Sequence, residues 1–157
     1  MSTFKRIIAV DKGNTCRGPM AATILQDLLK DDHLIVQSRG MVVLFPEPYN
    51  PKAVAVTAAH HMIMPSDRSV QLKEEDFGQD TLILVMNQSM KQKLYHTFPK
   101  ALNVFSMTEF AGVSEEEVPD PYGKGMDEYN QCFLGLFDLG VKIRERLHAE
   151  EKEKRGK

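Results

Sequence analysis

The chain alternates short apolar runs with segments whose apolar residues recur every three or four positions. The strongest strand signal is the run TLILVMN at 81–87. Runs of this kind predict four strands, at 4–10, 33–38, 81–87 and 103–107. Helical spacing predicts four helices, at 19–32, 51–61, 91–98 and 126–147. Strands separated by helices are typical of a covered parallel sheet, so we predict an α/β fold: a three-layer α/β/α domain with a four-stranded parallel sheet.

The composition fits one domain. The chain has 157 residues, 42% of them hydrophobic, and we treat 1–157 as a single domain whose charged tail frays from about residue 149. The formal net charge of −2 provides no basic face for nucleic acid. No apolar run approaches the roughly 18 residues that span a membrane, and the N-terminus lacks the features of a signal peptide. We therefore expect no nucleic-acid or membrane partner.

The two cysteines, Cys16 and Cys132, do not form a disulfide framework in a chain of this length. A reducing cytoplasm is the default compartment for such a protein. The cysteines are not paired at the spacing of a zinc site, so we expect no metal and no cofactor. Composition alone does not set an oligomeric state.

The most informative stretch is IIAVDKGNTCRGPM at 7–20, in which a strand leads into a glycine loop and then into a helix that starts near Pro19. Gly13 lets the backbone turn its N–H groups inward, and Asn14 tolerates a left-handed backbone. Arg17 adds a planar fork at the positive end of the helix. This order predicts a phosphate-binding loop after the first strand. Asp11 at its mouth is unexpected, because a carboxylate repels phosphate.

The string GNTCRGPMA resembles the signature C-x-G-N-x-C-R-S-P of the low-molecular-weight protein tyrosine phosphatase family. VPDPYG at 118–123 resembles the family's D-P-Y segment, which carries the general acid. SRG at 38–40 resembles its S-x-G, and the likeness extends over roughly 4–148. The resemblance implies a phosphotyrosine protein or an aryl phosphate as substrate.

The resemblance also implies roles for single residues. In the family a loop thiolate attacks phosphorus, the D-P aspartate protonates the leaving group, and water hydrolyses the cysteinyl phosphate. The matching catalytic positions here are Asp11 at the nucleophile position, Arg17 and Asp120. The matching phosphate-loop residues are Lys12, Gly13, Asn14, Thr15, Cys16 and Gly18, with Ser38 as loop support and Phe45 and Tyr122 in the substrate cleft.

The sequence departs from the family pattern at functional positions. Residue 11 is aspartate instead of the nucleophilic cysteine, and residue 18 is glycine instead of the serine that supports it. Asp67 stands where the family often has histidine. Cys16 matches the family's auxiliary cysteine and directly precedes Arg17, so it cannot take over the attack without rebuilding the loop.

Three explanations for Asp11 stay open at this point. Its carboxylate fills the loop itself, accepts the loop N–H groups and faces Arg17, with a strongly depressed pKa. It is instead a nucleophile that forms an acyl phosphate, although the usual second aspartate is replaced by Gly13. Or it is an engineered substitution that abolishes turnover. The first explanation predicts Asp11 oxygens within hydrogen-bond reach of loop N–H groups or Arg17.

The sequence supports a phosphatase-family protein whose thiol-based hydrolysis is impaired or absent. The alternative from another class is a non-catalytic pseudophosphatase, a binding module that uses the same cleft. Arsenate reductase chemistry, which shares this fold, needs further cysteines near the third strand. No cysteine lies between residues 17 and 131, which argues against it.

Overall fold

The computed structural model describes residues 4–65, 67–114 and 117–156. Its centre is a parallel sheet with the strand order β2-β1-β3-β4. The strands are β1 (Arg6–Asp11), β2 (Ile35–Gly40), β3 (Thr81–Val85) and β4 (Val104–Ser106). The four predicted strands and their parallel arrangement are confirmed, with β1 in the interior of the sheet. Ser66, which begins the stretch containing Asp67, lies outside the described residues.

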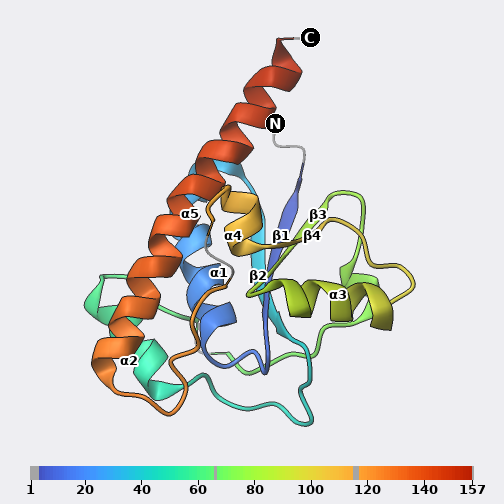
Figure 1. The fold of residues 1–157 in the computed structure, drawn as a ribbon. Coiled ribbons are helices and arrows are strands. Elements are labelled where there is room, and N and C mark those ends of the chain that lie inside the picture. Colours follow the sequence, from blue (N-terminus) through green and yellow to red (C-terminus); the bar gives the residue numbers. More distant parts are fainter. Residues whose placement is uncertain (1–3, 66, 115–116, 157) are drawn as a thin grey trace.

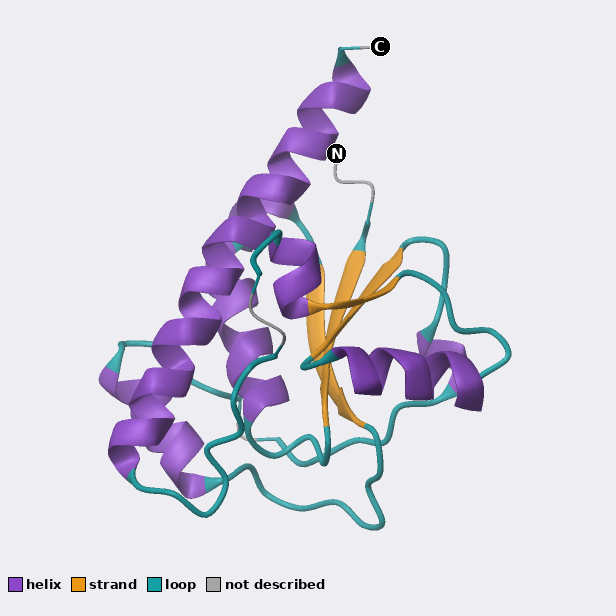
Figure 2. Cartoon of the chain, viewed as in Figure 1, coloured by secondary structure: helices purple, strands orange, loops and turns teal. Residues whose placement is uncertain are grey.

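Helices cover both faces of the sheet (Figure 1). One face carries α1 (Arg17–Leu28), α2 (Pro51–Ala59), α4 (Met107–Ala111) and α5 (Met126–Arg155). The other face carries α3 (Gln88–Thr97). Figure 2 shows that the loops leaving the strands gather at one end of the sheet. In parallel sheets this carboxyl end is where ligands bind, so the fold places the predicted phosphate loop at the usual site.

Two apolar cores follow from the alternation of side chains along β1. Ile7 and Ala9 face α1 and α5, whereas Ile8 and Val10 face the α3 side. Such continuous apolar strands are typical of a parallel sheet buried on both faces. The longest helix, α5, lies close against α1 at Gly140, where an added methyl group would come within 2.9 Å of the side chain of Leu28.

The sequence-based prediction was wrong about the C-terminal end. The tail was expected to fray from about residue 149, but α5 continues to Arg155. Ion pairs one helical turn apart support this extension: Arg146 with Glu150 at 3.0 Å and Arg155 with Glu151 at 2.8 Å. The short helix α4 was not predicted, although Ser106 and Glu109 form a capping box at its start.

Within the part of the chain that the structure describes, no helix combines the length and the apolar character needed to cross a membrane.

Candidate functional site

The loop between β1 and α1 is closed around the side chain of Asp11. Asp11 Oδ1 accepts a hydrogen bond from the backbone N–H of Asn14 at 2.6 Å. Its Oδ2 accepts from the N–H groups of Gly18 at 2.8 Å and Cys16 at 3.3 Å. The residue is only 3% exposed. The expectation that the Asp11 oxygens lie within reach of loop N–H groups is confirmed, so the side chain of Asp11 occupies the place in the loop where an oxyanion would bind.

The expected depression of the Asp11 pKa is wrong. Burial raises the pKa of this carboxyl above its ordinary value, and this effect outweighs the lowering by the N–H groups of Gly18, Asn14 and Cys16 and by the charge of Arg17. The reason is that full desolvation penalises the charged form. Arg17 lowers the pKa of Asp11 through its positive charge alone, because its guanidinium nitrogens contact Val118 and Asp120.

Gly18 lies directly against the Asp11 carboxylate. A Cβ at residue 18 would come within 2.9 Å of Asp11 Oδ1 and 3.0 Å of its Cγ. Real side chains avoid such distances, and Asp11 cannot withdraw without giving up its three N–H bonds. The two departures from the family signature therefore belong together: the larger side chain at position 11 requires the missing side chain at position 18.

Asn14 fixes the shape of the loop. Its backbone is left-handed, with φ 59°, a conformation that asparagine tolerates better than most residues. Its Nδ2 donates to Ser38 Oγ at 2.8 Å, and its Oδ1 accepts from the N–H of Val70 at 2.8 Å. Asn14, Gly18 and Ser38 thus hold the loop from behind and do not line the cleft, which agrees with the supporting position expected for Ser38.

Arg17 is buried and turned toward the Asp120 segment. Its Nη1 donates to the carbonyl of Val118 at 2.8 Å, and its Nη2 lies 3.6 Å from Asp120 Oδ2. Asp120 Oδ1 accepts from the N–H of Tyr122 at 3.1 Å. The fold therefore brings Asp11, Arg17 and Asp120 together across more than 100 residues of sequence, as their assignment to one site requires.

A cleft of about 680 Å³ opens above the loop. Phe45 and Tyr122 stand at its rim, 63% and 75% exposed, as expected for cleft residues. The remaining sequence-predicted residues that line it are Asp11, Lys12, Gly13, Thr15, Cys16, Arg17 and Asp120. Sequence reasoning missed Asn87, Met90 and Lys93, which also line it. They follow β3 at the carboxyl end of the sheet, and this position was the available signal.

Asp67 lies away from this cleft. It lines a second cavity beside α1, and its Oδ1 accepts from the N–H of Arg68 at 3.2 Å. Its difference from the family's histidine therefore does not alter the floor of the cleft.

Neither cysteine is placed for nucleophilic attack. Burial raises the pKa of Cys16 to about 12, and burial likewise raises that of Cys132 to about 12. Only the thiolate is strongly nucleophilic, so both side chains are unreactive thiols at neutral pH. Among the described residues, no group of three histidine, cysteine or acidic side chains could hold a metal ion.

Comparisons with known proteins identify the lineage. Residues 6–153 match the family model described as low molecular weight phosphotyrosine protein phosphatase. The protein-tyrosine-phosphatase PtpB of Staphylococcus epidermidis is 31% identical over 139 residues, which cover 88% of this chain and 96% of the relative. The protein-arginine-phosphatase of Bacillus subtilis is 33% identical over 150 residues, covering 93% and 99%.

Among solved structures, the YwlE arginine phosphatase from Geobacillus stearothermophilus superposes with a TM-score of 0.87 at 29% identity. The match covers 95% of this chain and 96% of that one. The sequence match, the shared fold and the loop built around residue 11 agree with one another. The chain therefore belongs to the low molecular weight phosphotyrosine protein phosphatase family.

Proposed function

We propose that this protein is a pseudophosphatase: a family member that does not hydrolyse phosphate esters and uses its cleft to bind a partner. The observation that carries the proposal is the position of Asp11, a buried residue whose two oxygens accept three hydrogen bonds from loop N–H groups. These donors would otherwise serve a bound phosphate. A phosphate dianion would also meet the negative charge of the carboxylate.

The buried geometry argues against Asp11 as a nucleophile. An attacking carboxylate oxygen needs an open path to phosphorus, but Asp11 is 3% exposed and its oxygens face the backbone. Enzymes that form aspartyl phosphates pair two carboxylates around a metal ion, and residue 13 is glycine. An acyl-phosphate mechanism is therefore not part of the proposal.

What remains of the cleft suits binding. No hydrogen bond leaves the N–H groups of Gly13 and Thr15 toward any group in the described ranges, and both residues line the cleft. These donors lie close to a carboxylate, and apolar side chains such as Phe45 stand at the rim. A neutral acceptor such as a peptide carbonyl fits this arrangement better than a dianion. We propose an unphosphorylated protein segment as occupant of the cleft.

The proposal is tested by restoring the nucleophile. Hydrolysis of p-nitrophenyl phosphate and of a phosphoarginine peptide is compared for the unmodified protein, Asp11→Cys, and Asp11→Cys with Gly18→Ser. Both substrates are needed because the relatives are named for both activities. We expect no turnover by the unmodified protein and measurable turnover by the double variant.

Two controls sharpen this test. Asp120→Asn in the double variant should lower turnover by about 10²-fold or more, as expected on loss of a general acid. A chelator should have no effect. Turnover by the unmodified protein that disappears with Asp11→Asn would refute the proposal. Turnover that survives this change would point to a contaminating enzyme.

A further inference from the structure

A second site lies at the edge of the sheet, outside the phosphate-loop cleft. β2 is an edge strand whose inner side pairs with β1. The N–H of Ile35 donates to the carbonyl of Lys5 at 3.1 Å, and that of Met41 to the carbonyl of Asp11 at 2.9 Å. The backbone N–H and carbonyl groups of the odd-numbered residues of β2 therefore point toward β1. Those of residues 36, 38 and 40 point away from the sheet.

The chain itself covers only one end of this edge in the described ranges. The N–H of Gly40 donates to Val70 at 2.8 Å, and the carbonyl of Gly40 accepts from Leu72 at 3.0 Å, as in a parallel ladder. The segment then leaves the strand, because the N–H of Ser69 donates to the carbonyl of Glu47 at 2.8 Å. The pairing of Gly40 with Gln71 is thus an isolated bridge at one end of the β2 edge.

The rest of the edge offers unpaired main-chain groups. Within the described part of the chain, the N–H and carbonyl of Val36 and the N–H of Ser38 have no hydrogen-bond partner. The carbonyl of Ser38 accepts only from Nη1 of Arg39, a flexible side chain on the next residue, at 2.8 Å. Such a row of donors and acceptors is a template for another strand.

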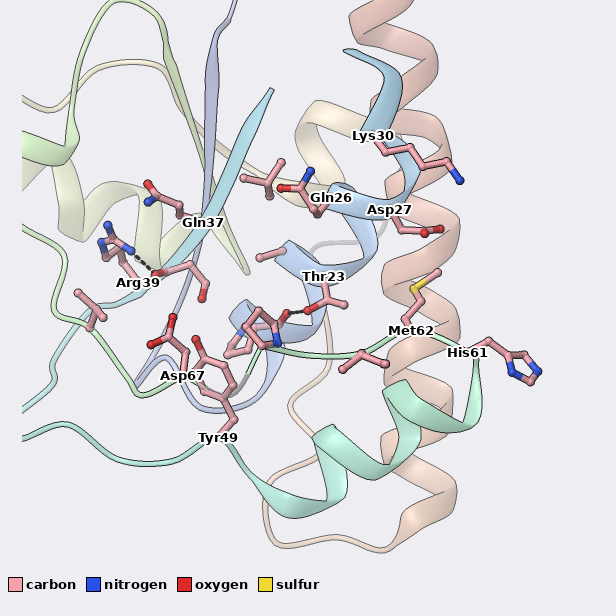
Figure 3. A pocket seen from close by; sticks show the side chains of 17 residues that line it. Thr23, Gln26, Asp27, Lys30, Gln37, Arg39, Tyr49, His61, Met62 and Asp67 are labelled. Atoms are coloured by element: carbon pink, nitrogen blue, oxygen red, sulfur yellow. Dashed lines mark hydrogen bonds between the residues drawn. The ribbon is translucent and has the colours of Figure 1, made fainter. Parts of the chain in front are cut away.

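A cavity of about 590 Å³ adjoins this edge (Figure 3). α1 forms one wall with Ala22 and Thr23, and the segment after α2 forms the opposite wall with Met62 and Ile63. Val36 and Ser38 lie in register with Ile7 and Ala9, so their side chains share the face that α1 covers. A strand laid along the edge would place alternate side chains in this cavity.

Charged side chains of both signs surround the apolar walls. Asp27 and Lys30 lie at one side of the cavity, and Asp67 and Arg39 at the other (Figure 3). Balanced charge gives no preference for a strongly acidic or basic ligand. The selective features are the main-chain groups of β2 and the apolar walls.

We propose that the edge of β2 at 36–38 is a docking site for an extended peptide segment of another protein. The segment adds to the sheet beside β2 by main-chain hydrogen bonds and places an aliphatic side chain in the cavity. The edge lies between two walls, one from α1 and one from Met62, Ile63 and Pro65. A second copy of this chain carries the same walls around its own β2, so two such edges cannot meet.

The site also reaches the phosphate loop. Ser38 Oγ binds the Asn14 side chain at 2.8 Å, and Asn14 binds the N–H of Val70 at 2.8 Å. A docked strand would therefore lie one side chain away from the residue that fixes the loop. The docking site does not depend on whether the cleft hydrolyses phosphate esters.

The test uses a defined peptide and backbone NMR of the full chain. The probe is a blocked heptapeptide that alternates threonine and valine between two lysines, and its control is the same peptide N-methylated at alternate backbone nitrogens. We expect the probe to shift the amide signals of Val36 and Ser38 saturably and to slow their hydrogen exchange. The amides of Gln37 and Arg39, which face β1, should change little.

Two variants test the site without touching the cleft. Val36→Pro removes an N–H that has no partner in the described structure, so the strand can tolerate it. Ile63→Glu places a charge on a wall residue that is 87% exposed, so the fold is unaffected. Each should weaken binding about tenfold or more, as should N-methylation of the probe.

Several results would overturn the proposal. These are unchanged amides at Val36 and Ser38 up to millimolar probe, equal binding of the N-methylated peptide, or signal changes centred on Phe45 and Tyr122 in the cleft. A dimer in sedimentation that dissociates on Val36→Pro would assign the edge to a second copy instead.

Discussion

The α-carbon of Gly18 faces the carboxylate of Asp11 so closely that a Cβ at residue 18 would lie 2.9 Å from Asp11 Oδ1. The same carboxylate accepts the Gly18 N–H at 2.8 Å. The two residues are thus joined by one hydrogen bond and by a shared steric limit. Changing either residue should alter what the other position tolerates.

Gly18→Ala should destabilise the unmodified protein by about 1–3 kcal/mol, because the methyl group overpacks against a carboxyl group held by three N–H groups. In an Asp11→Ala background the same change should be neutral or stabilise by up to about 1 kcal/mol, the gain in helix propensity. Urea unfolding of the four proteins measures the coupling. Additive effects would show that the contact is not restrictive.

Stability should depend on pH through Asp11. Because burial raises its pKa in the folded state, the folded protein binds the proton more tightly than the unfolded chain does. The protonated carboxyl group contributes its full stabilisation of the fold below its pKa in the unfolded chain, near 3.8. This stabilisation is lost as the pH rises through the pKa of the folded state.

Asp11→Asn cannot titrate and removes this contribution. The unfolding free energy of the unmodified protein minus that of the variant should therefore fall as the pH rises above the unfolded value, near 3.8, and through the folded pKa. Urea unfolding at a series of pH values upward from this point measures the difference. A difference that rises with pH would mean that the N–H groups and Arg17 outweigh burial.

Asn14→Ala should cost about 2–4 kcal/mol, because it removes bonds to Ser38 and Val70 and places alanine in a left-handed backbone. Asn14→Gly removes the same hydrogen bonds, but glycine adopts the left-handed backbone without strain. This variant should therefore be about 1 kcal/mol more stable than Asn14→Ala. Thermal or urea unfolding of both variants separates the two contributions. Equal losses would indicate that the left-handed conformation carries no strain.

Gly140→Val should destabilise by about 1–3 kcal/mol, because a Cβ there already meets Leu28 at 2.9 Å and Ile24 at 3.2 Å between α5 and α1. Gly135 lies on the same helix with open space around its missing Cβ. Gly135→Val should therefore change stability by less than about 0.5 kcal/mol. Similar effects at both positions would refute close packing of the two helices.

Periodicity was enough to predict the strands, the main helices and the loop after β1. The strands were predictable because each is a continuous apolar run, as for TLILVMN. The length of α5 was not, because Ala149 is the one apolar residue in its last turns, which are supported by charge pairs such as Arg155 with Glu151. The helix α4, at Met107–Ala111, is too short to show a helical repeat.

The site was predictable where a local motif carried it. The loop signature placed Asp11 and Arg17, and the D-P-Y segment placed Asp120. The pKa of Asp11 was not predictable, because it depends on a balance between desolvation and hydrogen bonds that only the burial decides. Asn87 and Met90 could not be assigned to the cleft from the sequence, because that assignment depends on the order of the strands in the sheet.

The carboxylate in the loop is an intramolecular ligand, and its effective concentration at the loop does not depend on dilution. A free oxyanion that competes for the same N–H groups must therefore displace a group that never diffuses away. Phosphate mimics that inhibit phosphatases through this loop should bind this protein weakly even at high concentration. The loop also needs no bound anion to hold its shape, since the chain supplies its own.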